Sequence, residues 1–246
     1  MNRWIFDLGN TRLKCAPLND DGSLGTVHAL AHDETGFVDA LEALLPADAD
    51  SACLASVGSP ALTAAVLDVL ASRFQRISIA RSVAQLAGVR IAYAEPARLG
   101  VDRFLALLAA RARAPRPWLV VGVGTAITID LLDRAGQHRG GRIAPSPRLM
   151  REALHHAAAQ LPAQGGDYVE FAADSHDALA SGCGGAALGL IERSLREATQ
   201  VLGEAPGLLL HGGGADALVP HLPHATQAPA LVLEGLALWS RAGTTL

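Results

Sequence analysis

Apolar residues follow two spacings along the chain, and their alternation predicts the elements of an α/β protein. Short apolar runs predict strands, and the runs within residues 1–31 predict a strand meander that turns at Asn19–Gly22. Further strands are expected at Ala52–Val57 and Ile77–Ile79. Between these strands, apolar residues at helical spacing predict helices. Strands that alternate with helices in this way are typical of an α/β domain.

The helices of the first half have recognisable ends. The spacing of apolar residues predicts a helix over Asp33–Leu45, which Pro46 ends. A second helix is predicted to begin at Pro60, because Ser59 is a good N-cap and proline is favoured at the first helical position. A third is expected from Phe104 to about Arg113.

The proline-rich segment Ala114–Pro117 is the best candidate for a boundary between two halves. We therefore predict an N-terminal domain over residues 1–116 and a C-terminal domain over residues 117–246. The elements predicted in the second half are strands within Leu119–Leu132, a turn at Asp133–Gln137, helices over Arg148–Leu161 and Ala178–Leu202, a strand at Leu208–Leu210 with a glycine turn before a helix, and a helix over Ala230–Trp239.

One strand–turn–strand pattern occurs twice. Ile5–Lys14 and Val120–Asp130 each consist of an apolar run, a turn that contains glycine, a threonine and a second apolar or mixed run. When Gly9 is placed on Gly124, Asp7 falls on Gly122. Two such units about half a chain apart indicate a duplicated fold. A cleft between the two halves would then have a turn facing it from each side.

The first turn has the residue types that could hold a triphosphate and its metal ion. Asp7 supplies a carboxylate, Thr11 a hydroxyl and Lys14 a cation, while the turn itself offers backbone amides. Gly9 allows a tight turn, and Asn10 tolerates unusual backbone angles. The alternative is an ordinary hairpin in which Asn10 and Thr11 only reverse the chain.

Asp102 stands where the third helix is predicted to begin, and it has two interpretations. It could be the N-cap of that helix, or a general base whose ionised form the helix dipole stabilises. Arg103 is either a solvated surface charge or an anion-binding group. The glycine turn Gly212–Gly214 could admit an adenosine moiety or could be a plain connection.

Composition excludes several classes of protein. The chain has 246 residues, of which 50% are hydrophobic and 18% charged, enough to bury a sizeable core. A net charge of -4 argues against a nucleic-acid-binding surface. The three cysteines are far apart, as expected of buried thiols in a reducing compartment. Because no secretory signal is visible and the longest apolar run is too short to span a bilayer, we expect a cytoplasmic protein without membrane contact.

Six segments in order resemble type III pantothenate kinase, a family of the acetate/sugar kinase, Hsp70 and actin superfamily. The resemblance covers nearly the whole chain. It rests on Asp7-Leu8-Gly9-Asn10-Thr11 with Lys14; Tyr93 with Leu99-Gly100-Val101-Asp102-Arg103; Gly124-Thr125-Ala126 with Thr128 and Asp130; Gly140-Gly141-Arg142-Ile143 with Pro145, Leu149 and Met150; Gln160-Leu161-Pro162; and Leu231-Val232-Leu233-Glu234-Gly235-Leu236. It implies an α/β fold of duplicated ribonuclease-H-like, actin-like ATPase domains with a central cleft.

The resemblance also implies an activity, its ligands and their sites. Family members transfer the γ-phosphoryl of ATP to pantothenate, the first step of coenzyme A synthesis, and they are homodimers. Asp102 would be the catalytic base, and Asp7 would hold Mg²⁺ through the nucleotide. The implied ATP-binding residues are Asp7, Leu8, Gly9, Asn10, Thr11, Arg12, Leu13, Lys14 and Thr125; the implied pantothenate-binding residues are Tyr93, Gly100, Val101, Asp102, Arg103 and Ser175.

Two positions depart from the family pattern. The family has an aspartate in the second turn and links it to a monovalent cation, K⁺ or NH₄⁺, whereas this chain has Gly122 there. We therefore expect weak or absent dependence on that cation. The usual Pro-Gly of the later loop is Pro145-Ser146, a change that could alter the loop. The alternatives to pantothenate phosphorylation are a kinase of another small hydroxyl acceptor and a non-catalytic regulatory relative.

Overall fold

The computed structural model describes residues 2–32 and 36–242, and the chain divides into two compact units. Unit 1 extends to Ala114 and includes the segment Gly136–His138 and the chain from Ala230 onward. Unit 2 comprises Pro115–Ala135 and Arg139–Pro229. This division differs from the predicted halves because two segments of the second half return to unit 1. The spacing of apolar residues predicts that a helix has a buried face, but not which unit covers it.

Unit 1 is a five-stranded sheet with helices. Its elements are β1 (Arg3–Leu8), β2 (Arg12–Leu18), β3 (His28–Ala31), α1 (Phe37–Leu44), β4 (Ala49–Ser56), α2 (Pro60–Arg73), β5 (Phe74–Ile79), β6 (Gln85–Leu86), β7 (Val89–Arg90), a 3₁₀ turn (Pro96–Arg98), α3 (Val101–Arg113) and α6 (Leu231–Ala242). The strand order is β3-β2-β1-β4-β5. β1, β2 and β3 form the predicted antiparallel meander, and β4 and β5 add to it in parallel.

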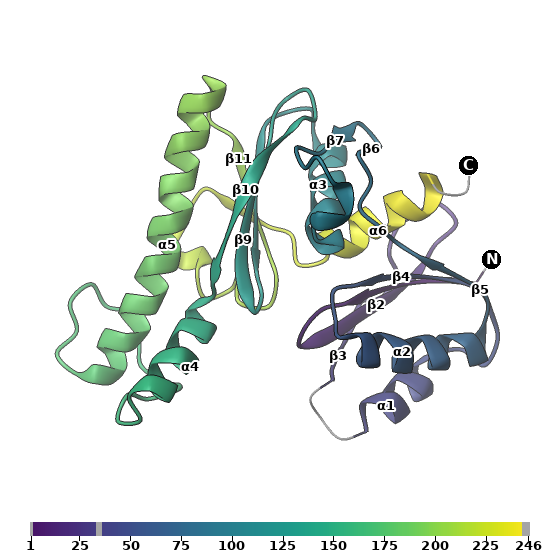
Figure 1. The fold of residues 1–246 in the computed structure, drawn as a ribbon, viewed down its shortest axis with the longest axis horizontal. Coiled ribbons are helices and arrows are strands. Elements are labelled where there is room, and N and C mark those ends of the chain that lie inside the picture. Colours follow the sequence, from purple (N-terminus) through teal and green to yellow (C-terminus); the bar gives the residue numbers. More distant parts are fainter. Residues whose placement is uncertain (1, 33–35, 243–246) are drawn as a thin grey trace. The chain divides into compact units, whose positions relative to one another are not determined.

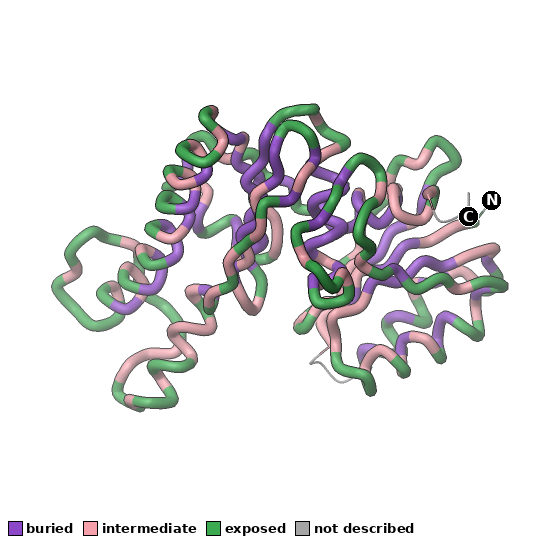
Figure 2. The backbone as a smooth tube through the Cα atoms, turned by 45° about the horizontal axis from the view of Figure 1, so that its top comes forward, coloured by how far each residue is buried: buried purple, intermediate pink, exposed green. Residues whose placement is uncertain are grey.

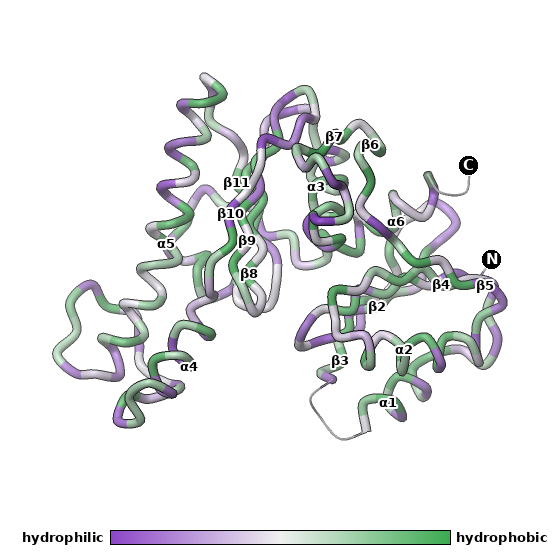
Figure 3. Tube along the Cα trace, viewed as in Figure 1, coloured by the Kyte–Doolittle hydropathy of each residue, from purple (hydrophilic) through white to green (hydrophobic). Residues whose placement is uncertain are grey.

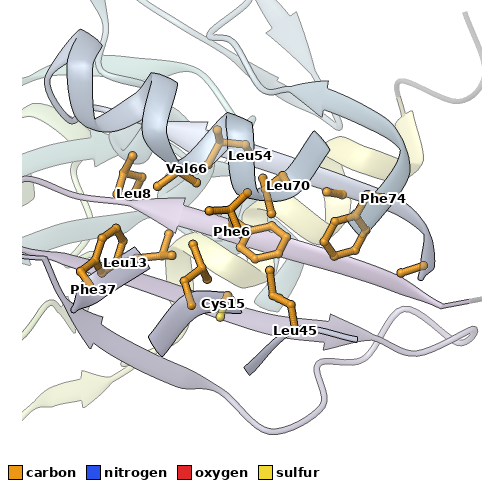
Figure 4. Packing of buried hydrophobic residues seen from close by; sticks show 14 residues of the cluster. Phe6, Leu8, Leu13, Cys15, Phe37, Leu45, Leu54, Val66, Leu70 and Phe74 are labelled. Carbon is orange, nitrogen blue, oxygen red and sulfur yellow. The ribbon is translucent and has the colours of Figure 1, made fainter. Parts of the chain in front are cut away.

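The core of unit 1 lies between one face of this sheet and helices α1 and α2 (Figure 1). Side chains from both layers meet there, among them Phe6 from β1, Leu70 from α2 and Phe74 from β5 (Figure 4). Helix α2 begins as predicted, because the Ser59 side chain accepts a hydrogen bond from Leu62 N–H and Pro60 is its first residue.

Helices α3 and α6 of unit 1 pack against each other, and α6 also contacts β1. They approach so closely that a Cβ atom at Gly235 of α6 would lie 1.9 Å from the Leu105 carbonyl oxygen of α3. No side chain fits at that distance, so glycine at this position permits the contact. The packing holds α6 against the strand that carries Asp7.

Unit 2 repeats the sheet of unit 1. Its elements are β8 (Trp118–Val123), β9 (Ala126–Leu132), β10 (His138–Pro145), α4 (Pro147–Ala157), α5 (Ser175–Leu202), β11 (Gly207–His211), a 3₁₀ turn (Val219–His221) and β12 (Ala225–Gln227). The strand order β10-β9-β8-β11-β12 matches that of unit 1 strand for strand. β8 pairs antiparallel with β9 and parallel with β11, as β1 does with β2 and β4. The duplication predicted from the two turns is therefore confirmed.

The core of unit 2 lies between its sheet and the long helix α5. The buried positions of α5 include Ala187, Leu188, Ile191 and Ala198, which pack in one cluster with residues of β8, β9 and β11. Figure 2 shows buried and exposed stretches alternating along α5, and Figure 3 shows hydrophobic and hydrophilic residues alternating around its turns. One face of the helix thus closes the sheet and the other stays exposed.

Several predicted boundaries need correction. The first helix begins at Phe37 rather than Asp33, and residues 33–35 of the predicted helix lie outside the described residues. Helix α3 begins at Val101 rather than Phe104. Within the described part of the chain, the glycine turn after β11 leads to a 3₁₀ turn rather than to the expected α-helix. No helix among the described residues is long and apolar enough to cross a membrane.

Candidate active site

The turn between β1 and β2 joins the carboxylate and the cation that the sequence placed together. Asp7 of β1 and Lys14 of β2 are paired in the antiparallel register. Gly9 N–H donates to the Arg12 carbonyl oxygen at 3.0 Å and closes the turn. A Cβ at Gly9 would lie 3.3 Å from that oxygen, so the glycine serves a close approach. Asn10 does not use the unusual backbone angles anticipated for it, since Ala87 is the one non-glycine residue with positive φ among the described residues.

His32, at the end of β3, braces this turn, a role the sequence did not predict. Its Nε2 atom lies 3.1 Å from the Gly9 carbonyl oxygen, and its backbone N–H donates to the Thr11 carbonyl oxygen at 3.4 Å. Since a carbonyl oxygen only accepts hydrogen bonds, Nε2 is the donor. The imidazole also packs edge-on to Phe37, with ring centroids 5.9 Å apart. The turn is thereby fixed to the neighbouring strand.

The electrostatic setting of Asp7 is unusual. Burial, the largest cause, and the negative charge of Asp102 raise the pKa of Asp7 from 3.8 to about 7, while Lys14 acts to lower it. Two carboxylates that influence each other in this way share one region, although β1 and α3 are far apart in sequence. Unit 1 therefore brings together Asp7, Lys14 and Asp102, three residues that the sequence analysis selected separately. Strongly perturbed pKa values of this kind are concentrated at functional sites.

Asp102 lies in the first turn of α3. The N-cap of this helix is Gly100, which has no side chain to make a capping hydrogen bond. The interpretation of Asp102 as the N-cap is therefore wrong. A Cβ at Gly100 would lie only 2.6 Å from Oδ1 of Asp102. The carboxylate is thus folded back over Gly100, at the N-terminal end of α3.

Arg103 and Tyr93 form a second part of the site. Arg103 is 6% exposed, which rules out its interpretation as a solvated surface charge. Its Nη1 atom donates to the Tyr93 hydroxyl at 3.3 Å, and its guanidinium carbon lies 5.9 Å from the centroid of the Tyr93 ring. Val101, the first residue of α3, is also buried. Within the predicted run Gly100–Arg103, it is Arg103 that packs beside Tyr93.

Tyr93 has a further partner that sequence reasoning missed. The His138 ring is stacked on the Tyr93 ring, with centroids 6.1 Å apart and an angle of 10° between the planes. His138 is 1% exposed. Its only visible signal in the sequence is that it precedes Gly140-Gly141-Arg142, and nothing in that pattern names Tyr93 as the partner.

The second turn lies in unit 2, between β8 and β9, and is one residue shorter than the first. Gly122 pairs with Thr128 across β8 and β9, and Gly124 N–H donates to the Ala126 carbonyl oxygen at 2.9 Å. The position that corresponds to the carboxylate of Asp7 is not open. A Cβ at Gly122 would lie 2.7 Å from Thr128 Oγ1 and 2.9 Å from His211 Nε2. The imidazole of His211 thus occupies the space into which a side chain at this position would extend.

Two other predicted positions belong to unit 2. Ser146 N–H donates to the carbonyl oxygen of Thr125, at 3.4 Å, and the Ser146 side chain accepts from Leu149 N–H as the N-cap of α4. Serine in place of the usual glycine therefore starts the next helix while its backbone holds the second turn. Ser175 is the exposed first residue of α5, after the N-cap Asp174. Thr125 and Ser175 thus belong to unit 2, whereas Asp7, Lys14 and Asp102 belong to unit 1.

The residues of unit 1 fit a metal ion that arrives on a nucleotide. Among the described residues there is no group of three or more histidine, cysteine, aspartate or glutamate side chains that could hold a metal ion by themselves. Mg²⁺ is usually held by one or two carboxylates together with substrate phosphates and water. Asp7 and Asp102 supply that number of carboxylates.

Comparisons with known proteins identify the family to which the sequence is similar. A family model described as type III pantothenate kinase matches residues 4–197. A type III pantothenate kinase of Stenotrophomonas maltophilia (strain K279a) is 60% identical over 240 residues, which cover 98% of each chain. One from Xanthomonas axonopodis pv. citri (strain 306) is 56% identical over 245 residues, and 100% of each chain is covered.

Solved structures show the same fold in distant proteins. A Campylobacter jejuni protein, whose suggested assignment is a Baf family transcriptional activator, matches with a TM-score of 0.65 at 18% identity over 99% of this chain and 100% of that one. The activator of 2-hydroxyisocaproyl-CoA dehydratase from Clostridium difficile, solved with bound ADPNP, matches with a TM-score of 0.53 at 11% identity over 100% and 95%. The predicted duplicated α/β fold of sugar kinases and actin-like ATPases is confirmed. From the family model and the full-length relatives, the chain belongs to the type III pantothenate kinase family.

Proposed function

We propose that this chain transfers the γ-phosphoryl group of ATP to the primary hydroxyl of pantothenate, as its family name implies. The observation that carries the proposal is the joint setting of Asp7 and Asp102, whose charges influence each other beside Lys14. A phosphoryl-transfer site needs negative groups for metal and acceptor and a positive group for the phosphates. These three side chains meet that need within one unit.

In this proposal the β1–β2 turn binds the nucleotide. Asp7 faces the metal, while Lys14, Thr11 and the backbone amides of the turn contact phosphate oxygens. Mg²⁺ bound to ATP would supply neutralisation of the phosphate charge. Since phosphoryl transfer has a loose transition state, fixed positions and charge complementarity contribute more than proton removal. The bracing of the turn by His32 supports this assignment, because a fixed turn presents its amides in one geometry.

The acceptor is proposed to bind at Tyr93 and Gly100–Arg103. Asp102 accepts the hydrogen bond of the attacking hydroxyl, which orients its lone pair toward the phosphorus. The buried guanidinium of Arg103 suits the carboxylate of pantothenate, since arginine pairs with carboxylates through two parallel hydrogen bonds. Thr125 as a nucleotide contact and Ser175 as a pantothenate contact remain parts of the proposal.

The test is a coupled assay for ADP with the purified chain, MgATP and pantothenate. Pantothenate should stimulate ADP release, and the Asp102→Asn variant should lower kcat by roughly 10²–10⁴-fold with its fold intact. Related compounds that have the primary hydroxyl but lack the β-alanine carboxylate serve as alternative acceptors. ADP release that ignores pantothenate, or follows another acceptor better, would reject the proposed substrate. Near-normal turnover by Asp102→Asn would remove Asp102 from its role.

We also propose that the chain is a cytoplasmic homodimer. The support is an apolar groove in unit 2 between α4 and α5, about 750 Å³ in volume, whose lining includes Leu149, Met150, Leu154 and Leu179. Phe171, in the same unit, is 99% exposed. Exposed apolar surface of this kind is typical of an interface. Leu154→Glu should convert a dimer into a monomer in analytical ultracentrifugation, and a wild-type monomer would contradict the proposal.

A further inference from the structure

We propose that His138 is a positioning residue of the acceptor site, which acts through Tyr93 and fixes the ring that Arg103 contacts. This inference rests on the proposed function and adds to it a residue from the second half of the sequence. His138 is the first residue of β10, yet it belongs to unit 1 with Gly136 and Gln137. The three-residue segment is thus a part of the second half of the sequence that is built into the first unit.

Hydrogen bonds and close backbone packing join the segment Gly136–His138 to the rest of unit 1. Arg90 N–H donates to the Gly136 carbonyl oxygen at 2.9 Å, and the Gln137 side chain donates to the Arg90 carbonyl oxygen at 3.1 Å. Gly136 has φ of 84°, and a Cβ there would lie 1.9 Å from the Gly88 carbonyl oxygen. Only glycine permits this close approach in that backbone conformation. These contacts hold the segment that carries His138 against unit 1.

His138 in turn holds the chain around Tyr93 at two points. Ala92 N–H donates to His138 Nδ1 at 3.4 Å, so Nδ1 carries no proton. The His138 ring is parallel to the Tyr93 ring within 10°, with centroids 6.1 Å apart. The backbone before Tyr93 and the ring of Tyr93 are thus both held by one buried imidazole.

Two residues therefore contact Tyr93, one at its hydroxyl and one at its ring. Arg103 Nη1 donates to its hydroxyl at 3.3 Å, and His138 is stacked on its ring. A tyrosine restrained in this way presents its hydroxyl and ring edge in one orientation. Loss of His138 removes one of these two restraints on Tyr93, which weakens a pre-formed acceptor site and leaves the β1–β2 turn unchanged.

The test compares steady-state kinetics of His138→Ala, His138→Phe and His138→Asn with the wild type. The alanine variant should raise KM for pantothenate about tenfold, with KM for ATP changed less than about twofold. Phenylalanine retains a ring to stack, and asparagine retains an acceptor for Ala92 N–H. Each should therefore give an intermediate increase of about threefold. His28→Ala is the matched control, since His28 stacks on Trp4 in the same unit at 6.4 Å. It should leave both KM values unchanged.

A double-substitution cycle with Tyr93→Ala separates positioning from a general structural role. If His138 acts through Tyr93, His138→Ala should change KM for pantothenate less than about twofold in the Tyr93→Ala background. A full effect in both backgrounds, a parallel rise of both KM values, or an unchanged KM for pantothenate in all three variants would overturn the inference. If His138→Ala does not fold, the phenylalanine and asparagine variants decide it. A wild-type protein that does not use pantothenate would reject the proposed function and this inference with it.

Discussion

Asp7, which we propose faces the metal ion, also lowers the stability of the fold near neutral pH. Its pKa is raised from 3.8 to about 7, chiefly because burial disfavours the charged form and then because Asp102 repels it. The folded state therefore holds a proton that the unfolded state has released between these two pH values. Stability from neutral Asp7 is fully present below about pH 4 and is lost as the pH rises through about 7.

Asp7→Asn should consequently increase stability while it removes activity. At pH 8 we expect the free energy of unfolding to exceed that of the wild type by on the order of 2 kcal/mol, and the gain to vanish toward pH 4. Urea unfolding at several pH values measures it, with the exposed Asp48→Asn as control. A variant that is less stable than wild type at pH 8 would contradict the inference that ionised Asp7 destabilises the folded state. Calorimetry should show weakened MgATP binding in the same variant.

Gly100 should be required for the present position of the Asp102 carboxylate. Because a Cβ at Gly100 would lie 2.6 Å from Asp102 Oδ1, Gly100→Ala forces the carboxylate to move. A displacement of about 1 Å in a positioned group can cost about 10²-fold in rate, so we expect kcat to fall by roughly 10–10²-fold. KM for ATP should be unchanged.

The control for this substitution is Gly189→Ala in α5, where no atom lies within 4 Å of the added Cβ. It should keep the wild-type rate. Normal kcat in Gly100→Ala would mean that Asp102 can leave its present position without loss, and its assignment as the acceptor-side base would then fail.

Individual residues were predictable from sequence to the extent that they lie in local patterns. Asp7, Lys14 and Asp102 stand at turns or helix starts, and such places can be read from spacing. His138 and His32 could not be selected in this way. Each acts through a contact with a distant strand or loop, Ala92 and Tyr93 for the first and Gly9 for the second. A single sequence does not indicate such partners.

Among the elements, the two turns show how a duplicated structure has diverged. The Asp7–Lys14 pair of the first turn corresponds to the Gly122–Thr128 pair of the second. His211 of β11 fills the space that Gly122 leaves. The second turn thus has an imidazole near the position where the first turn has a carboxylate, and imidazole is a poor ligand for hard cations.

The rate should therefore be independent of K⁺. Initial rates measured against KCl at constant ionic strength, with Na⁺ or a bulky organic cation as replacement, should be flat. Gly122→Asp alone should not create a K⁺ response, because its side chain would meet Thr128 and His211. Gly122→Asp combined with Thr128→Ala and His211→Ala removes both contacts and should gain one. A steep, saturating rise with K⁺ in the wild type would show that the cation site survives without the carboxylate.

At the scale of the whole molecule, α6 ties the end of the described chain to the first unit. Its backbone at Gly235 lies so near α3 that an added Cβ would be 1.9 Å from the Leu105 carbonyl oxygen. Gly235→Ala should separate the two helices and lower the free energy of unfolding by about 1–3 kcal/mol or more, measured by urea denaturation. Gly185→Ala in α5, where the added Cβ would make an ordinary contact 3.7 Å from Tyr168 Oη, is the control. Equal stability of both variants would contradict the packing.

The fold class could be predicted from sequence because the duplication left two copies of one local pattern. The division into units could not be predicted from sequence, because the spacing of apolar residues in α6 would be the same whichever unit the helix packs against. Gly136–His138 is too short to have a pattern at all. Both segments were assigned to the second half by position, whereas tertiary packing places them in unit 1.

The return of α6 to unit 1 has a consequence for the order in which the protein is made. A ribosome completes all of unit 2 before it releases the helix that α3 and β1 need. Domains usually fold as units while the chain emerges, those nearest the N-terminus first. Here the first unit must wait with its α3 surface uncovered until α6 (Leu231–Ala242) has been made, so unit 2 is the one able to finish first. Nascent chains stalled before Ala230 should accordingly be protease-sensitive in their N-terminal part and dependent on chaperones.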